Sequence, residues 1–217
     1  MKKNIIKLLI ILFIIIILSI ILITFLNKKV VPIYMSYSKG VMKRVVTTVI
    51  NKTVSDIEIG NDLFIIKETN TTEMASYDPI VLNKIISSIS NNVYDNLKKI
   101  EDMDKNSFNK FNIDQNIFYI PTGIIFDSVM LNNIGPKIPV KLELIDSINS
   151  SIETKVTEYG INNSLIEVSV KVIATIRTIL PISSDDMEVQ VIVPIAVKII
   201  QGNIPEYYFG GVNKKSS

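Results

Sequence analysis

The fold of this chain is decided near its C-terminal end, where residues 165–180 read LIEVSVKVIATIRTIL. Apolar side chains recur at every second position, opposite polar residues such as Glu167, Lys171 and Arg177. Successive side chains of a β-strand point to opposite faces of the sheet, so this period predicts a long strand with one packed face. The residues expected on that face are Ile166, Val168, Val170, Val172, Ala174 and Ile176.

Neighbouring segments extend this strand into an antiparallel β-meander. The same alternation runs through residues 140–145 and 187–200, and residues 152–158 predict another strand. Turn residues separate these runs at 160–163 and 181–186. Pro194 lacks a backbone N–H, so we expect it at an edge or a bulge. The packed face of the last strand is expected to carry Val189, Val191, Val193, Ile195, Val197 and Ile199.

Two helices are expected before the sheet. Asp78 and Pro79 form a helix start, with an N-cap carboxylate followed by proline at the first helical position. Pro32 is expected to start an earlier helix, which either packs on the sheet or forms a juxtamembrane stalk. The apolar side of the earlier helix is expected to hold Tyr34, Tyr37, Val41, Val45 and Val49. The apolar side of the later helix is expected to hold Leu82, Ile85, Ile86, Ile89, Val93, Leu97 and Ile100.

The predicted fold is therefore α+β, with two main helices packed on an antiparallel β-meander. Residues 63–67 and 72–76 predict a short hairpin between the helices, and the polar residues 101–116 predict a loop. We expect a single domain over residues 30–217.

An uncharged apolar stretch from Leu8 to Leu26 precedes this domain. At 1.5 Å per helical residue it is long enough to cross the hydrocarbon core of a bilayer, which is about 30 Å thick. No small-x-small cleavage site follows Leu26, so residues 1–29 predict an uncleaved single-span anchor. Lys2 and Lys3 favour a cytoplasmic N-terminus, with the domain on the opposite side of the membrane.

The charge balance argues against nucleic acid as a partner. The chain has 23 basic and 21 acidic side chains, and five lysines flank the apolar stretch. Removing those five leaves 18 basic against 21 acidic residues, a net charge near −3 for the domain. A basic surface for DNA or RNA is therefore not expected. The five are Lys2, Lys3, Lys7, Lys28 and Lys29.

The absence of cysteine and histidine excludes many catalytic and metal sites, including thiolate nucleophiles, Ser-His-Asp triads and imidazole ligands. The acidic run around Asp104 begins like a calcium-binding EF-hand, but Asn109 stands where glycine is needed and Gln115 where glutamate is needed. Paired carboxylates for hydrolysis are expected on the exposed face of the strands, where charge is ordinary. These carboxylates are Glu143, Asp146, Glu153, Glu158 and Glu167. We therefore predict no catalytic, cofactor-binding or metal-binding residues.

The apolar residues 124–131 lie between two irregular segments rich in turn residues, at 121–123 and 132–139. This arrangement is consistent with an ordered loop, a surface for a partner, or a rigid connector into the long strands.

Several separated motifs resemble, in order, the sporulation protein YunB family. They are GPKIPV at 135–140, YGINNSLIEV at 159–168, VPI at 193–195, and IQGNIP at 200–205 with Gly210-Gly211. The resemblance implies a membrane-associated protein of endospore-forming bacteria that is needed for normal spores, and it implies no catalytic residue. Thr122 departs from the Pro-Leu-Gly expected there.

Three functions are consistent with these observations. The first is a non-enzymatic, membrane-anchored structural or assembly factor at a membrane around the forming spore, with protein partners in the spore envelope. The others are a lipid- or ligand-binding envelope domain, with an apolar groove between sheet and long helix, and a carboxylate-dependent cell-wall hydrolase.

Overall fold

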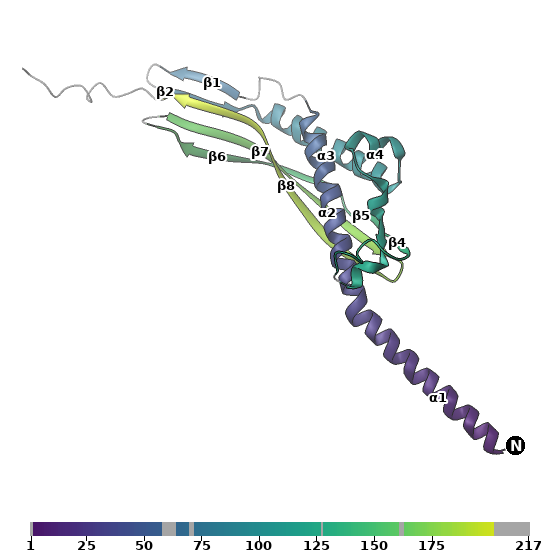
Figure 1. Ribbon diagram of the computed structural model, residues 1–217. Coiled ribbons are helices and arrows are strands. Elements are labelled where there is room, and N and C mark those ends of the chain that lie inside the picture. The colour runs from purple at the N-terminus through teal and green to yellow at the C-terminus, as the bar shows by residue number, and fades with distance from the viewer. Residues whose placement is uncertain (1, 58–63, 70–71, 127, 161–162, 202–217) are drawn as a thin grey trace, which may run out of the picture. The chain divides into compact units, whose positions relative to one another are not determined.

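The computed structural model describes residues 2–57, 64–69, 72–126, 128–160 and 163–201 (Figure 1). Contacts between Cα atoms divide the chain into two compact units. The first comprises Met1–Val45, Ile100–Ile145 and Ile176–Met187, and the second comprises Val46–Lys99, Asp146–Thr175 and the chain from Glu188 onward. The predicted α+β class is confirmed, since the chain contains both helices and antiparallel strands.

One continuous helix opens the chain, made of α1 (Lys2–Phe25), the π-helical turn η1 (Leu26–Val30) and α2 (Val31–Ser55). The expectation that Pro32 starts a new helix is wrong, because Pro32 is the second residue of α2. Proline has no N–H to bond the carbonyl four residues back. The wider turn directly before it, in which the Val31 N–H bonds the Leu26 carbonyl, lets the helix continue past this missing bond.

The two halves of this helix differ in the burial of their side chains. All side chains described in α1 are exposed, whereas α2 buries a regular stripe that includes Tyr34, Val45 and Val49. Tyr37 and Val41 were expected on the same side, but Tyr37 is exposed and Val41 is only half-buried. The stripe instead includes Met35, Met42, Val46 and Ile50.

The helix α3 (Pro79–Glu101) begins as predicted, because the Asp78 carboxylate accepts the Ile80 N–H at 2.8 Å. Its predicted apolar side is buried from Ile89 to Ile100. In the second unit, the buried Asn96 Nδ2 of α3 donates to the Thr53 hydroxyl of α2 at 2.9 Å. A polar pair inside an apolar contact fixes how these two helices align, because leaving either group unpaired would be costly.

The sheet is built around β7 (Asn163–Leu180), as the alternating pattern of residues 165–180 predicts. β6 (Asn149–Glu158) pairs with its first part and β5 (Lys141–Leu144) with its last part, both antiparallel, and β8 (Ser183–Gln201) also pairs with β7. The predicted packed positions of β7 are buried. In the second unit, Ile166 and Val168 pack against Leu82 and Ile85 of α3.

The alternation of β8 changes phase beyond Pro194. Val189 and Val191 are buried as predicted, but Val197 and Ile199 are exposed, while Ala196 and Ile200 are partly buried. An extra residue in a strand shifts every later side chain to the other face. Among the described residues β8 pairs with β7 alone, so Pro194 lies on an edge strand, as expected.

The short hairpin is also confirmed, because β1 (Phe64–Thr69) and β2 (Thr72–Tyr77) pair antiparallel. β6 and β7 form the hairpin predicted around residue 160, although residues 161 and 162 of its turn lie outside the described residues. The motif residues 202–211 also lie outside them.

The predicted loop at 101–116 is wrong, because it contains the helix α4 (Lys105–Phe111), followed by the 3-10 turn η3 (Gln115–Phe118). The Asp104 carboxylate caps α4 by accepting the Ser107 N–H at 2.9 Å. Phe108 and Phe111 are buried, and the ring of Phe108 meets that of Phe118 edge-on at 5.5 Å. Packing of these aromatic rings thus stabilises a helix in a segment that was predicted to be a loop because it is polar overall.

A small hairpin, β3 (Tyr119–Pro121) and β4 (Lys137–Pro139), completes the first unit. Its connecting loop begins with the 3-10 turn η4 (Thr122–Phe126). The Thr122 N–H bonds the Pro136 carbonyl at 2.9 Å, and the Gly123 N–H bonds the Ile134 carbonyl at 2.8 Å. These bonds continue the hairpin pairing into the loop and close its neck.

Replacing Gly123 by alanine should disrupt this neck. A Cβ at Gly123 would lie 1.8 Å from the Leu131 carbonyl oxygen and 2.7 Å from that of Ile134. Both obstacles are backbone atoms, so we expect Gly123→Ala to destabilise the protein by about 1–3 kcal/mol. Urea unfolding in detergent, followed by far-UV circular dichroism, would measure the change.

The matched control is Gly40→Ala in α2, where an added Cβ meets nothing within 4 Å. Alanine favours a helix over glycine by about 0.5–1 kcal/mol, so this variant should be slightly more stable than the parent. Equal effects of the two substitutions would contradict the assigned role of Gly123.

Candidate functional site

Two of the carboxylates considered for hydrolysis, Glu143 and Glu153, take part in ordinary ion pairs. Glu153 lies 3.3 Å from Lys171, and Glu143 lies 3.6 Å from Arg177, with all four side chains at least partly exposed. Within the described ranges, no group of three or more His, Cys, Asp or Glu side chains could hold a metal ion. The candidate calcium run is used differently, since Asp104 caps α4 and the Glu101 carboxylate accepts the Leu144 N–H at 3.0 Å.

Two Ser-x-x-Lys runs, at Ser36–Lys39 and Ser107–Lys110, have the spacing of a serine nucleophile and lysine base, which the absence of cysteine and histidine does not exclude. Lys39 forms an ion pair with Asp185, so its ammonium group already has a structural partner. The buried Ser107 hydroxyl donates to the Asp104 carboxylate at 2.7 Å. Both runs therefore have structural partners.

A cluster of ion pairs lies in the first unit at the β7–β8 hairpin. Arg177 of β7 makes a two-pronged contact with Asp186 of β8, at 2.6 Å from Nε and 3.1 Å from Nη2. Lys39 of α2 contacts the Asp185 carboxylate and donates to the Asp186 carbonyl at 3.2 Å. These contacts connect the helix to the hairpin and involve no apolar surface.

Hydrogen bonds from Arg177 lower the pKa of the Asp186 carboxyl, and the same contact raises the pKa of the guanidinium. The arrangement is therefore a fixed pair of charges at neutral pH, which suits an architectural role.

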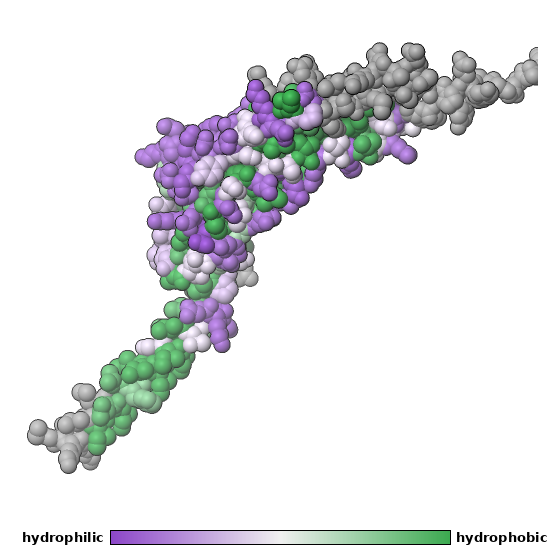
Figure 2. Space-filling view, turned by 180° about the vertical axis from the view of Figure 1, so that it is seen from behind, coloured by the Kyte–Doolittle hydropathy of each residue, from purple (hydrophilic) through white to green (hydrophobic). Residues whose placement is uncertain are grey.

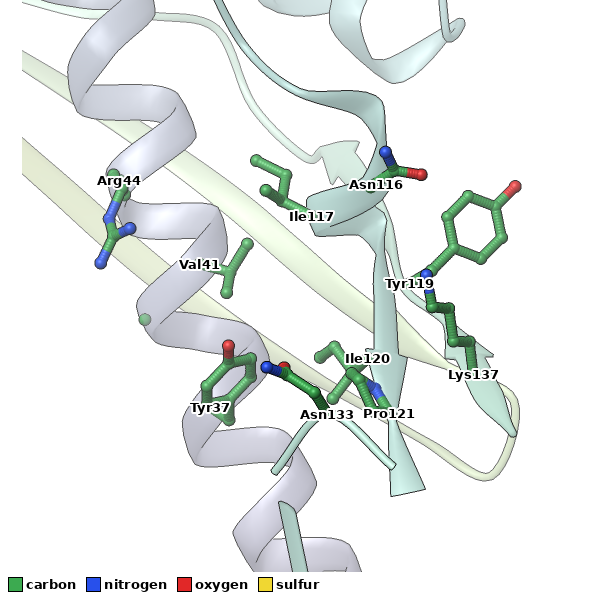
Figure 3. Close-up of a pocket in the computed structure, with 11 residues that line it drawn as sticks. Tyr37, Val41, Arg44, Asn116, Ile117, Tyr119, Ile120, Pro121, Asn133 and Lys137 are labelled. Atoms are coloured by element: carbon green, nitrogen blue, oxygen red, sulfur yellow. The ribbon is translucent and has the colours of Figure 1, made fainter. Parts of the chain in front are cut away.

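One cavity of the first unit lies between α2 and the segment from η3 to β4, with a volume of about 560 Å³ (Figure 3). Figure 3 shows Val41 and Ile117 pointing toward each other across it, with Tyr37 beside Asn133. This cavity lies between α2 and the small hairpin, a different place from the groove between sheet and long helix that the sequence predicts. Its lining residues are Tyr37, Gly40, Val41, Arg44, Asn116, Ile117, Tyr119, Ile120, Pro121, Asn133 and Lys137.

The charged residues that line this cavity are all basic. Arg44 and Lys137 contribute cations, Tyr37 and Tyr119 contribute hydroxyls, and no lining residue is acidic. Apolar walls with a few cationic and polar groups suit a small molecule that has an apolar part and an anionic group. Sequence reasoning missed this set because its members come from four separate segments.

The Asp186 pair leads to a pH-dependent prediction. A carboxyl whose pKa is lowered by folding stabilises the protein above its ordinary pKa of 3.8, and this contribution is lost as pH falls through the lower folded value. Asp186→Asn should therefore lower the melting temperature modestly at pH 7, because the pair is exposed. The difference from the parent should shrink as the pH is lowered below 3.8, measured by circular dichroism.

Glu188→Gln, at an exposed position of the same strand, is the control and should change the melting temperature little at any pH. A difference for Asp186→Asn that stays constant down to strongly acidic pH would show that its effect does not come from charge.

Comparison with known proteins agrees with the resemblance read from the motifs. The family model described as Sporulation protein YunB matches residues 117–207. The chain is also 30% identical over 191 residues to Sporulation protein YunB of Bacillus subtilis (strain 168), covering 85% of this chain and 74% of that protein. No solved structure matches. The matched region begins at η3 and includes the small hairpin and the whole sheet, and the chain belongs to the sporulation protein YunB family.

Proposed function

We propose that this protein is a membrane-anchored, non-enzymatic factor that helps to assemble the envelope of the forming spore. The observation that carries the proposal is α1, a long apolar helix whose described side chains are all exposed, joined without a break to folded α+β structure. In water such a helix would expose an apolar surface far larger than soluble proteins tolerate.

A lipid bilayer is the environment that fits this helix. The continuous helix from Leu9 to Ser55 contains a stretch long and apolar enough to cross a membrane, with none of that stretch buried. The hydroxyls of Ser19 and Thr24 donate hydrogen bonds to helix carbonyls at 2.8 Å, so these residues present no unsatisfied donor to lipid. We propose a single span with a cytoplasmic N-terminus and residues 30–217 on the other side, as one tethered domain.

An architectural role agrees with how polar groups are used. The prominent charged residues of the first unit connect α2, β5, β7 and β8. Of the former candidate acids, Glu143 belongs to an ion pair and Asp104 is a helix cap. Membership in a sporulation family indicates that the protein acts in sporulation, and the proposed location is a membrane around the forming spore.

Charged substitutions in the anchor should abolish function. Each lysine at the centre of a span costs about 2.5–3.5 kcal/mol of insertion free energy, so Ile16→Lys with Leu18→Lys should remove the protein from the membrane fraction. In a strain lacking the native gene, this variant should give spores as heat-sensitive and poorly refractile as those of the null strain. A fluorescent fusion should change from the forespore envelope to a diffuse signal.

The control for the anchor is Ile16→Leu with Leu18→Ile, which keeps the hydropathy and should restore normal spores. Glu143→Gln and Glu153→Gln, tested singly, should also restore them. Full loss of function from either carboxylate variant would favour the hydrolase, and normal spores from the lysine variant would argue against a membrane anchor.

The cavity beside α2 favours a second candidate, the binding of an anionic amphiphile. Its apolar walls would take an acyl or isoprenoid chain, and Arg44 and Lys137 would neutralise an acidic head group. An envelope factor with such a site would recognise a lipid component of the membrane in which it lies.

This candidate is tested by native mass spectrometry of the full-length protein. The parent should co-purify with anionic lipid, and Arg44→Glu with Lys137→Glu should lose it, since both cations line the cavity. Lys43→Glu is the matched control, because Lys43 neighbours Arg44 on the helix but does not line the cavity. Equal lipid content in all three proteins would exclude binding at this cavity.

A further inference from the structure

The loop that joins β3 to β4 presents an apolar tip to solvent. Val129 is 92% exposed and Met130 is 88% exposed, and Phe126 and Ile134 are also exposed. Between Thr122 and Pro136 the sequence has one charged residue, Asp127. Large apolar side chains that protrude together from a soluble structure mark a surface that another apolar phase covers.

The exposure belongs to an ordered loop. Its neck is closed by the bonds of Thr122 and Gly123 to the opposite strand, described above. Nearer the tip, the N–H groups of Leu131 and Asn132 bond the Ser128 carbonyl at 2.9 and 3.0 Å. The Ile134 N–H bonds the Leu131 carbonyl at 2.9 Å. Backbone groups that bond one another within the loop are not left bare when they enter a less polar layer.

The loop lies beside the start of α2. Ile124 and Asn132 line a cavity of about 590 Å³ together with Pro32, Ile33, Ser36 and Tyr37. In Figure 1 the teal segment that leads into β4 lies next to the beginning of α2, close to the point from which α1 extends. Figure 2 shows hydrophobic residues gathered at the part of the folded chain that adjoins the apolar helix.

This position is close to the expected surface of the bilayer. Pro32 follows the last apolar residue of the span, Leu26, by six positions, which is about 9 Å at 1.5 Å per residue. The head-group layer on each side of the hydrocarbon core is about 5–7 Å thick. A loop beside Pro32 and Ile33 therefore has only a short distance to cover to reach that layer with its tip.

The surrounding chemistry favours lipid over a protein partner. Lys28 and Lys29 lie in η1 between the span and the loop, where their ammonium groups can reach lipid phosphates while the stems lie along apolar surface. The residues from Val30 to Ser38 carry no charge, so no ionic group on this stretch opposes contact with the interface. Beyond Lys28 and Lys29, an uncharged stretch beside the loop thus follows the apolar anchor.

We propose that residues 122–126 and 128–135 belong to an interfacial membrane-binding loop, whose tip at Val129 and Met130 enters the head-group region of the bilayer that holds α1. The inference rests on the proposed membrane anchor. It gives the protein a second contact with the membrane, made by side chains that are almost fully exposed in their own chain.

The absence of native cysteine allows a direct test. Full-length protein with the single substitution Val129→Cys is labelled with the fluorophore NBD and reconstituted into liposomes of phosphatidylcholine and phosphatidylglycerol. Ile15→Cys reports on the anchor. Val156→Cys is the matched control, because it is a valine of β6 that is also exposed, at 62%.

We expect the Val129 label to emit at shorter wavelength than the Val156 label, to lose most of its quenching by aqueous iodide, and to be quenched by doxyl lipids. The anchor label should show the same behaviour more strongly. Replacing Met130 by aspartate in the Val129→Cys protein should restore iodide quenching without affecting the anchor label, since an ionised carboxylate is costly to insert.

The outcomes separate the two proposals. An anchor label inside the bilayer with a Val129 label as accessible as Val156 would overturn the interfacial loop and leave the anchor standing. An anchor label accessible to iodide would overturn the anchor, and the loop proposal with it. Protection of Val129 that persists in detergent solution, without doxyl quenching in liposomes, would identify a protein contact and reject lipid as the partner.

Discussion

The structure depends on one continuous helix whose first half is apolar and exposed and whose second half is packed into the fold. Breaking the helix between α1 and α2 would let the apolar half and the folded part turn independently. Pro32 is the residue most able to break this helix, because it has no backbone N–H. The π-helical turn at Leu26–Val30 accommodates the missing hydrogen bond, so the helix continues past Pro32. The orientation of α1 is thus transmitted to the first residues of α2, on which the small hairpin and its loop are packed.

Patterns confined to a single element were predictable from the sequence. The alternation from Ile166 to Ile176 identified the packed face of β7, and Asp78 with Pro79 identified the start of α3, because each signal is a local consequence of backbone geometry. The predictions were wrong where residues distant in the sequence determine the local structure. Phe108 is held in α4 by contact with Phe118, and the phase of β8 changes beyond Pro194, so a strict period of two failed there.

The same distinction between local signals and contacts of distant residues applies to the candidate sites. Missing residue types are a property of composition alone, so cysteine and histidine chemistry could be excluded without any knowledge of which residues meet in space. The cavity between Val41 and Ile117 could not be predicted, because its walls come from α2 and from a hairpin far along the chain. The apolar run at 124–131 was visible as an irregular segment, but only the bonds at Gly123 identify it as an ordered loop, the first of the three alternatives that the sequence left open.

A second membrane contact changes what a tethered domain can do. A domain held by one helix can rotate about that axis and so presents every face to the surrounding space. If the loop at Val129 also enters the interface, rotation is restricted, because leaving the bilayer would return its apolar side chains to water. The Arg177 cluster would then be held in the same orientation on each copy. For the proposed role in envelope assembly, this regular orientation would give partners that arrive from solution one surface at a constant distance from the lipid.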